Sequence, residues 1–376
     1  PEVQATATQS TSTWQSTPQP GATAVSYYPT VPTASVWNTY DPSLHYYYSQ
    51  LDYKEKSAFS CRYDAIALGR ADLWDISNLG LTGRQTKRVE IALNCDCPEL
   101  MTAGFSEGLY AFYQTMSPGS SDWYQNEARQ NARLLQSALS AINRIRQQSE
   151  WSSTDFSKEL AYDRYVVKNC LYVLDNDGPK GSLHLDTDYR AAYSALVNAT
   201  AVCEGYARST ALAMRVFGIP CIYVHGGTAS GGYHAWNMIR IDGSWYQYDA
   251  TWNDTNDESS YRDYLPYFNI SDARMYRSRS LEPEFASYGF SMPVCASESA
   301  NYYNKNGQYL SSSQVSRIPQ LMKQAKSRGE RAVGILFENE SAYNAALKYI
   351  NNGSAYPGFH YSYSANQKAM FIYFTW

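Results

Sequence analysis

The sequence predicts an α+β protein whose core pairs one helix with an antiparallel sheet. Residues 203–217 carry apolar side chains at helical spacing, and residues 233–241 and 244–250 are two strand-like runs on either side of a tight turn. Towards the C-terminus, residues 332–376 contain a strand, a helix and a strand in that order. We therefore expect a helix-and-sheet core, preceded by a helical region and followed by a small α+β domain.

The helix of the predicted core begins at Cys203. Tyr206, Ala213 and Phe217 fall on one face of such a helix, and Gly218 is a typical C-terminal stop. The free N–H groups of the first turn and the positive end of the helix dipole favour a thiolate over a thiol. Cys203 is therefore a candidate nucleophile.

The strands of the core follow the helix directly. Residues 221–225 are predicted to form a short strand, and the glycine-rich residues 226–232 a loop. An Asp-Gly pair then separates residues 233–241 from residues 244–250, and Asp-Gly is a strong signal for a two-residue hairpin turn. The two runs should pair antiparallel.

Pairing in this hairpin places His234 near Asp249. If Asp242 and Gly243 are the central turn residues, His234 falls opposite Thr251, and Asp249 is a diagonal neighbour on the same face of the sheet. A small stagger or bulge would then let the carboxylate reach the imidazole. In nucleophilic catalysis a thiol can act as the nucleophile, an imidazole as its base, and a carboxylate as the group that orients the base.

Four motifs around these residues resemble the core of bacterial transglutaminase-like proteins, a papain-like superfamily. They are Ala201-Val202-Cys203-Glu204-Gly205-Tyr206-Ala207, Gly218-Ile219-Pro220, His234-Ala235-Trp236-Asn237 and Tyr248-Asp249-Ala250-Thr251-Trp252-Asn253. The resemblance covers roughly residues 150–280 and implies a papain-like transglutaminase core. It implies Cys203 as nucleophile, His234 as base and Asp249 as the partner of the base. The superfamily includes crosslinking enzymes, peptidases, amidases and members without demonstrated activity, so the substrate stays open.

Four further residues are candidates for substrate binding. An oxyanion hole needs two donors, of which the backbone N–H of Cys203 is the first. Tyr172 and Asn169, expected at the end of the helix that precedes Cys203, are candidates for the second. Trp236 and Trp252 flank His234 and Asp249 and either wall a substrate groove or pack in the core.

Metal and cofactor sites are not expected. Cys203, Cys221, His225 and His234 could be ligands, but the chain has no Cys-x-x-Cys or paired His-x-x-x-His spacing. The acidic run 253–258 lacks the glycine and the spaced acids of an EF-hand loop, so we expect a solvated turn. His225 ends the predicted strand 221–225 before the glycines, and its side chain is expected to be solvated.

Composition divides the chain into four regions. Residues 1–40 are rich in Ser, Thr, Pro, Gln and Ala and are expected to form a disordered tether. Residues 41–150 are expected to be a helical accessory region, residues 151–292 the catalytic core and residues 293–376 a small α+β domain.

Charge and hydropathy exclude several classes of partner. The formal net charge is −4, and the absence of a Lys/Arg block argues against a nucleic-acid-binding surface. No run is long and apolar enough to cross a bilayer. The tether and the family favour secretion or attachment to a bacterial cell surface, with a signal or lipoprotein leader removed.

The cysteines other than Cys203 leave the redox compartment open. Six remain, so three disulfides or a fully reduced set are both compatible with the sequence. In Cys95-Asp96-Cys97 we expect one cysteine to pack and the other to be exposed or paired with Cys61.

Two functions are compatible with these features. The first is a secreted or cell-surface cysteine enzyme that performs acyl transfer or hydrolysis on protein or peptide amides through a thioester, with cell-wall or surface proteins as possible substrates. The second is a catalytically silent cell-surface binding or scaffold protein that keeps the fold.

Overall fold

The structure is a computed structural model of the chain. It describes residues 44–100, 121–173, 189–254, 264–353 and 360–376.

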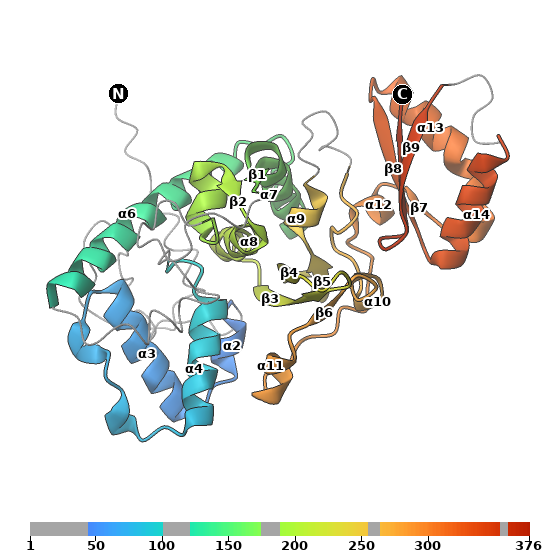
Figure 1. Cartoon of the computed structure of the whole chain (residues 1–376). Helices are drawn as coiled ribbons and strands as arrows, with labels where there is room; N and C mark the ends of the chain where they lie inside the picture. Colours follow the sequence, from blue (N-terminus) through green and yellow to red (C-terminus); the bar gives the residue numbers. More distant parts are fainter. Residues whose placement is uncertain (1–43, 101–120, 174–188, 255–263, 354–359) are drawn as a thin grey trace, which may run out of the picture.

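An antiparallel four-stranded sheet lies at the centre of the molecule (Figure 1). In spatial order its strands are β5 (Ser244–Tyr248), β4 (Tyr233–Ile241), β3 (Cys221–Thr228) and β6 (Arg279–Leu281). The helix α8 (Cys203–Phe217) packs against β3 and β4 and is buried along its whole length. The predicted α+β core of one helix beside an antiparallel sheet is confirmed.

The β4–β5 hairpin has the predicted register. Asn237 pairs with Tyr248, and Ile241 pairs with Ser244. Asp242 and Gly243 both have positive φ angles, 50° and 84°, as a two-residue hairpin turn with the twist of the flanking strands requires.

The predicted loop at residues 226–232 is wrong in its first half. β3 continues through Gly226 and Gly227 to Thr228, because this segment pairs with β4 on one side and with β6 on the other. The glycines therefore permit a close approach of strands and do not end the strand.

Helices surround α8 and extend to one side of the sheet (Figure 1). They are α2 (Tyr46–Ser49), α3 (Tyr53–Ala67), α4 (Gly83–Asp96), α6 (Ser121–Ile145) and α7 (Asp155–Asn169). Local signals explain their starts: Asp52 and Thr82 form capping boxes, and the Thr154 hydroxyl accepts the backbone N–H of Ser157. These helices share one buried core with α8 and the sheet.

Short elements connect these larger ones. They are the 3-10 helices η2 (Ala71–Leu73) and η3 (Ser77–Leu79), the parallel pair β1 (Leu171–Tyr172) and β2 (Thr200–Ala201), the π-helix η5 (Ser194–Asn198), and the helices α9 (Ala250–Asn253), α10 (Asp272–Met275), α11 (Pro283–Ser287) and α12 (Tyr302–Lys305).

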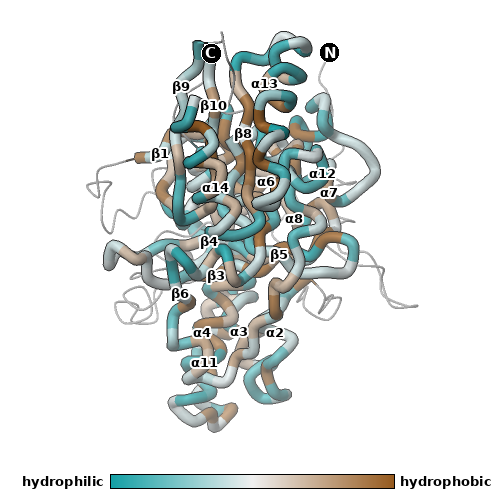
Figure 2. Tube along the Cα trace, turned by 90° about the vertical axis from the view of Figure 1, so that its right-hand side faces the viewer, coloured by the Kyte–Doolittle hydropathy of each residue, from teal (hydrophilic) through white to brown (hydrophobic). Residues whose placement is uncertain are grey.

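The C-terminal elements have a hydrophobic core of their own. Their sheet has the order β7 (Tyr309–Leu310), β8 (Ala332–Phe337), β10 (Phe371–Thr375) and β9 (Ser362–Asn366), packed with η6 (Ser312–Arg317), α13 (Ile318–Ser327) and α14 (Glu340–Asn351). All residues of β8 are buried, and Figure 2 shows this strand as a hydrophobic segment. The predicted strand, helix and strand correspond to β8, α14 and β10. The division of the chain into four regions stays a prediction.

All seven cysteines are free thiols. Cys95 and Cys97 are both buried, so the expectation that one of them is exposed or paired is wrong. The end of α4 explains this, because Arg215 of α8 bonds the Asp96 carbonyl and ties this segment into the core. In the part of the chain that the structure describes, no helix has the length and hydrophobicity needed to span a bilayer.

Candidate active site

Cys203 is the first residue of α8. The N-cap residue Val202 has no side-chain acceptor, so the first-turn N–H groups are left free of a side-chain cap. Gly205 allows this turn to lie close to the preceding chain, because a Cβ there would overlap the Tyr189 carbonyl oxygen and lie 2.9 Å from the Ala201 Cβ. Cys203 is 7% exposed. Its position is the predicted one.

His234 lies near the start of β4, opposite Gly226 of β3. Its Nε2 is 2.7 Å from Oδ2 of Asp249, and the two side chains are 5% and 1% exposed. The imidazole lies nearly parallel to the Trp236 ring at 6.0 Å between centroids and at 45° to the Trp252 ring at 5.4 Å. Both tryptophans therefore restrict its orientation.

Asp249 reaches His234 by a route different from the predicted diagonal pair. β5 ends at Tyr248, and Asp249 is the N-cap of α9, where its Oδ1 accepts the backbone N–H of Trp252 at 3.2 Å. Its Oδ2 is thereby directed to His234. The turn from strand to helix, and not a bulge in the hairpin, brings the two side chains together.

Opposite charges dominate the electrostatics of this pair. Burial raises the pKa of Asp249, but the charges of His234 and Arg279 and their hydrogen bonds lower it to about 2. Burial lowers the pKa of His234, but Asp249 and a hydrogen bond with the Cys203 side chain raise it to about 9. The ionised carboxylate therefore accepts from Nε2–H, and the opposite side of the ring is available to Cys203.

Arg279 was not among the predicted site residues. It lies at the start of β6, its side chain is fully buried, and its Nη1 contacts the same Asp249 oxygen as His234. The segment 277–281, Arg-Ser-Arg-Ser-Leu, has no apolar alternation that would indicate a buried strand. Nothing local in the sequence distinguishes Arg279 from a surface arginine.

The other predicted site residues lie in different surroundings. Tyr172 belongs to β1 and not to a helix end, and it is half-buried beside Cys203. Burial and the charges of Cys203 and Asp249 raise its pKa, although its hydroxyl oxygen accepts the Cys203 backbone N–H, which acts in the opposite direction. Asn169 is exposed at the end of α7 and donates to the Tyr165 carbonyl at 2.7 Å. The structure therefore brings Tyr172, and not Asn169, to Cys203.

The two tryptophans differ in burial. Trp236 is 1% exposed and donates its indole N–H to Oε1 of Gln247 at 2.8 Å, whereas Trp252 is half-buried. Trp236 is thus a core residue that supports His234. Only Trp252 has exposed surface to offer a groove.

Contrary to the expectation, His225 has a partly buried side chain. It lies on β3 with its ring 4.8 Å from Phe285 and 5.4 Å from Tyr233, and burial, followed by the charges of Arg208 and Lys87, lowers its pKa to about 4. Among the described residues, no cluster of three or more His, Cys, Asp or Glu side chains could hold a metal ion. Most of the acidic run 253–258 lies outside the described residues.

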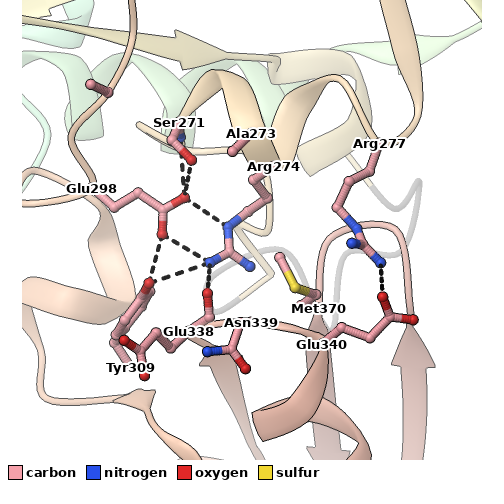
Figure 3. Close-up of a pocket in the computed structure, with 11 residues that line it drawn as sticks. Ser271, Ala273, Arg274, Arg277, Glu298, Tyr309, Glu338, Asn339, Glu340 and Met370 are labelled. Atoms are coloured by element: carbon pink, nitrogen blue, oxygen red, sulfur yellow. Dashed lines mark hydrogen bonds and ion pairs between the residues drawn. The ribbon is translucent and has the colours of Figure 1, made fainter.

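A separate cavity of about 570 Å³ lies where the core meets the C-terminal elements (Figure 3). Arg274 and Glu298 form a buried ion pair on one side, and Arg277 bonds Glu340 across it. None of the described residues that line the cavity is a cysteine or a histidine. It holds no thiol and no imidazole among these residues, so the candidate active site is the group around Cys203.

A helix that begins at a cysteine packs on an antiparallel sheet that carries a histidine, and an aspartate follows the last strand of the hairpin; this arrangement is consistent with a papain-like α+β core. Residues 143–250 match the model of the transglutaminase-like superfamily. This segment of the chain is therefore similar to transglutaminase-like domains. The match includes Cys203, His234 and Asp249 and ends before Arg279.

Two solved structures are similar to parts of the chain. One is described as a candidate cysteine protease from Cytophaga hutchinsonii, at 21% identity and a TM-score of 0.24, with 30% of this chain and 37% of that chain covered. The other is described as a TGase, at 20% identity and a TM-score of 0.27, with 38% and 36% covered. This chain thus spans little more than a third of each. No curated protein matches the sequence.

Proposed function

We propose that the chain is a cysteine enzyme that acts on protein or peptide amides through an acyl-thioester on Cys203. The observation that carries this proposal is the 2.7 Å contact between His234 Nε2 and Asp249 Oδ2 in a buried site whose imidazole also hydrogen-bonds the Cys203 thiol. A nucleophile, a base and a carboxylate that orients the base are the groups that acyl transfer uses.

In the first half of the reaction, the Cys203 thiolate attacks the carbonyl carbon of the amide. A C–S bond forms, and the oxyanion takes the Cys203 backbone N–H in place of the Tyr172 hydroxyl oxygen, with that hydroxyl as candidate second donor. The imidazolium of His234 gives its proton to the leaving nitrogen and the C–N bond breaks. Ammonia or an amine leaves, and the acyl group stays on sulfur.

In the second half, an acceptor attacks the thioester. His234 takes a proton from water or from an amine, the new C–O or C–N bond forms, and the C–S bond breaks to restore the thiolate. Water gives hydrolysis and an amine gives a crosslink. The alternative function, a silent binding protein with the same fold, predicts no thioester. The extracellular or cell-surface location stays a prediction from the composition of residues 1–40.

Alkylation with iodoacetamide separates an activated cysteine from a structural one. Cys221 is a matched internal control, because it is 8% exposed, close to the 7% of Cys203, and burial raises its pKa well above the ordinary thiol range. We expect Cys203 to react at least about tenfold faster than Cys221 at neutral pH, and His234→Ala to remove the difference. Equal rates at the two cysteines in the folded protein would contradict the proposed activation.

Incubation with a glutamine peptide and a labelled primary amine then separates the reaction types. A transferase forms the amide adduct, whereas a peptidase or amidase releases a free amine or ammonia without incorporating the label. Cys203→Ala is the control for both reactions. A protein that alkylates rapidly at Cys203 yet turns over no peptide amide would favour the silent binding function.

A further inference from the structure

Arg279 is a buried cation in direct contact with the carboxylate of the candidate site. Its side chain is 0% exposed, and its Nη1 contacts Oδ2 of Asp249, the oxygen that also receives His234. The pairing of β6 with β3, with Arg279 opposite Thr228, holds its main chain in the sheet. The guanidinium therefore approaches Asp249 from a different strand than His234 does.

Aromatic rings surround this guanidinium. Its Cζ lies 3.9 Å from the centroid of Trp252, 4.9 Å from that of Tyr267 and 5.4 Å from that of Trp236. Such faces stabilise a desolvated cation and fix the plane of the guanidinium. Burial of an unpaired arginine would be costly, so Arg279 and Asp249 compensate each other.

Both oxygens of Asp249 are thereby fixed in place. Oδ1 accepts the backbone N–H of Trp252, and Oδ2 lies between His234 and Arg279. A carboxylate held in this way cannot rotate away when the imidazole changes its charge. In the proposed reaction His234 alternates between imidazolium and neutral imidazole, and only Arg279 supplies a permanent positive charge.

We propose that Arg279 is a positioning residue of this site, which keeps the Asp249 carboxylate ionised and directed at His234 during the steps in which His234 is neutral. The proposal rests on the proposed function for its role in turnover. The effect of Arg279 on the charge and orientation of Asp249 does not depend on turnover and can be tested without it.

The titratable groups that interact with Asp249 come from three strands and a connecting segment. They are His234 on β4, Arg279 on β6, Tyr172 on β1 and Tyr267 in the segment before α10, and Cys203 on α8 interacts with His234. Arg279 is the one guanidinium among them, a group whose positive charge does not depend on the state of His234. A change of Arg279 should therefore be visible in the titration of Asp249.

The test is a titration of Asp249 in protein labelled with ¹³C at the aspartate carboxyl, with Asp249→Asn used to assign the signal. In the unmodified chain we expect Asp249 to remain ionised at about pH 4. In Arg279→Met it should titrate at least about one pH unit higher, and Arg279→Lys should restore most of the difference. Arg62→Met removes another arginine packed on an aromatic ring, with Cζ 4.2 Å from the Trp74 centroid, and should leave the titration unchanged.

A second arm covers the case in which Arg279→Met does not fold. His234→Gln keeps Arg279 and removes the other cation, so Asp249 should still titrate below its ordinary value of 3.8. A titration above that value, or an unchanged titration in folded Arg279→Met, overturns the proposal. If both titrations give the expected results but the unmodified chain turns over no amide, only the proposed function is contradicted, because the titration of Asp249 needs no catalysis.

Discussion

Gly226 of β3 lies so close to Ser280 of β6 that a side chain on Gly226 would overlap the Ser280 carbonyl oxygen. An added Cβ would also lie 2.9 Å from the backbone nitrogen of Glu282, which donates to the His225 carbonyl at 2.9 Å. Arg279 pairs with Thr228 on the same two strands, so a wider separation at Gly226 would move Arg279 relative to Asp249.

Gly226→Ala should therefore push β6 away from β3. We expect the free energy of unfolding to fall by about 1–3 kcal/mol, as for other overpacked positions, and alkylation of Cys203 to slow. Gly227→Ala is the matched control, because the nearest atom to an added Cβ there is the Ser280 hydroxyl at 3.8 Å. Urea unfolding measures the stability of both variants. Equal losses in the two would show that the close approach at Gly226 is unimportant.

The protonation of His234 gives a second prediction. Its pKa, raised to about 9 against an ordinary 6.5, means that the imidazolium contributes stability that is complete below pH 6.5 and is lost as the pH rises through 9. Asp249→Asn removes the charge that raises the pKa and leaves the burial that lowers it. We expect the titration of His234 to move from about 9 to below 6.5.

Nitrogen-15 NMR of the imidazole nitrogens measures this change and contains its own control. His225, whose pKa burial lowers to about 4, should titrate at the same pH in both proteins. Titration of His234 near 6.5 in the unmodified chain would mean that Asp249 does not hold the imidazolium.

Local signals explain what the sequence predicted correctly. The position of α8 follows from apolar spacing within one segment and from the glycine that ends it. The β4–β5 register follows from the two-residue Asp-Gly turn between these strands. Cys203 and His234 could therefore be placed on their elements without knowledge of the rest of the chain.

Contacts between distant segments explain what could not be predicted. Arg279 meets Asp249 only because β6 pairs with β3, and β6 has three residues with no apolar alternation. The same pairing turns Gly226 from an expected loop residue into a strand residue. Asp249 was correctly expected near His234, but the helix cap that orients it depends on where β5 ends.

The first turn of α8 gives a third prediction. An added Cβ at Gly205 would overlap the Tyr189 carbonyl oxygen, so Gly205→Ala should displace the turn that carries Cys203. We expect a loss of about 1–3 kcal/mol in unfolding free energy together with slower alkylation of Cys203. Gly83→Ala at the start of α4 is the control, because nothing lies within 4 Å of its added Cβ. Faster alkylation in Gly205→Ala would contradict the proposed packing of this turn.

The ion pair of Arg274 and Glu298 gives the last prediction, on the stability of the contact between the core and the C-terminal elements. Arg274 donates to both Glu298 oxygens at 2.8 and 2.9 Å (Figure 3). It also donates to the carbonyls of Ala369 and Phe337 at 2.8 and 3.0 Å. Burial raises the pKa of Glu298, but the hydrogen bonds and charge of Arg274 lower it to about 2 from an ordinary 4.5. The pair therefore contributes stability that is present above pH 4.5 and is lost as the pH falls through 2.

Arg274→Met leaves a buried carboxylate and two carbonyls without their donor. We expect the free energy of unfolding at pH 7 to fall by about 3–5 kcal/mol, and the difference from the unmodified chain to shrink as the pH falls, because Glu298 then takes a proton in the variant first. Arg70→Met, which breaks the exposed pair with Asp72, should change nothing measurable. Urea unfolding at several pH values measures these effects, and a loss in Arg274→Met that is independent of pH would mean that the carbonyl contacts, and not Glu298, account for the stabilisation.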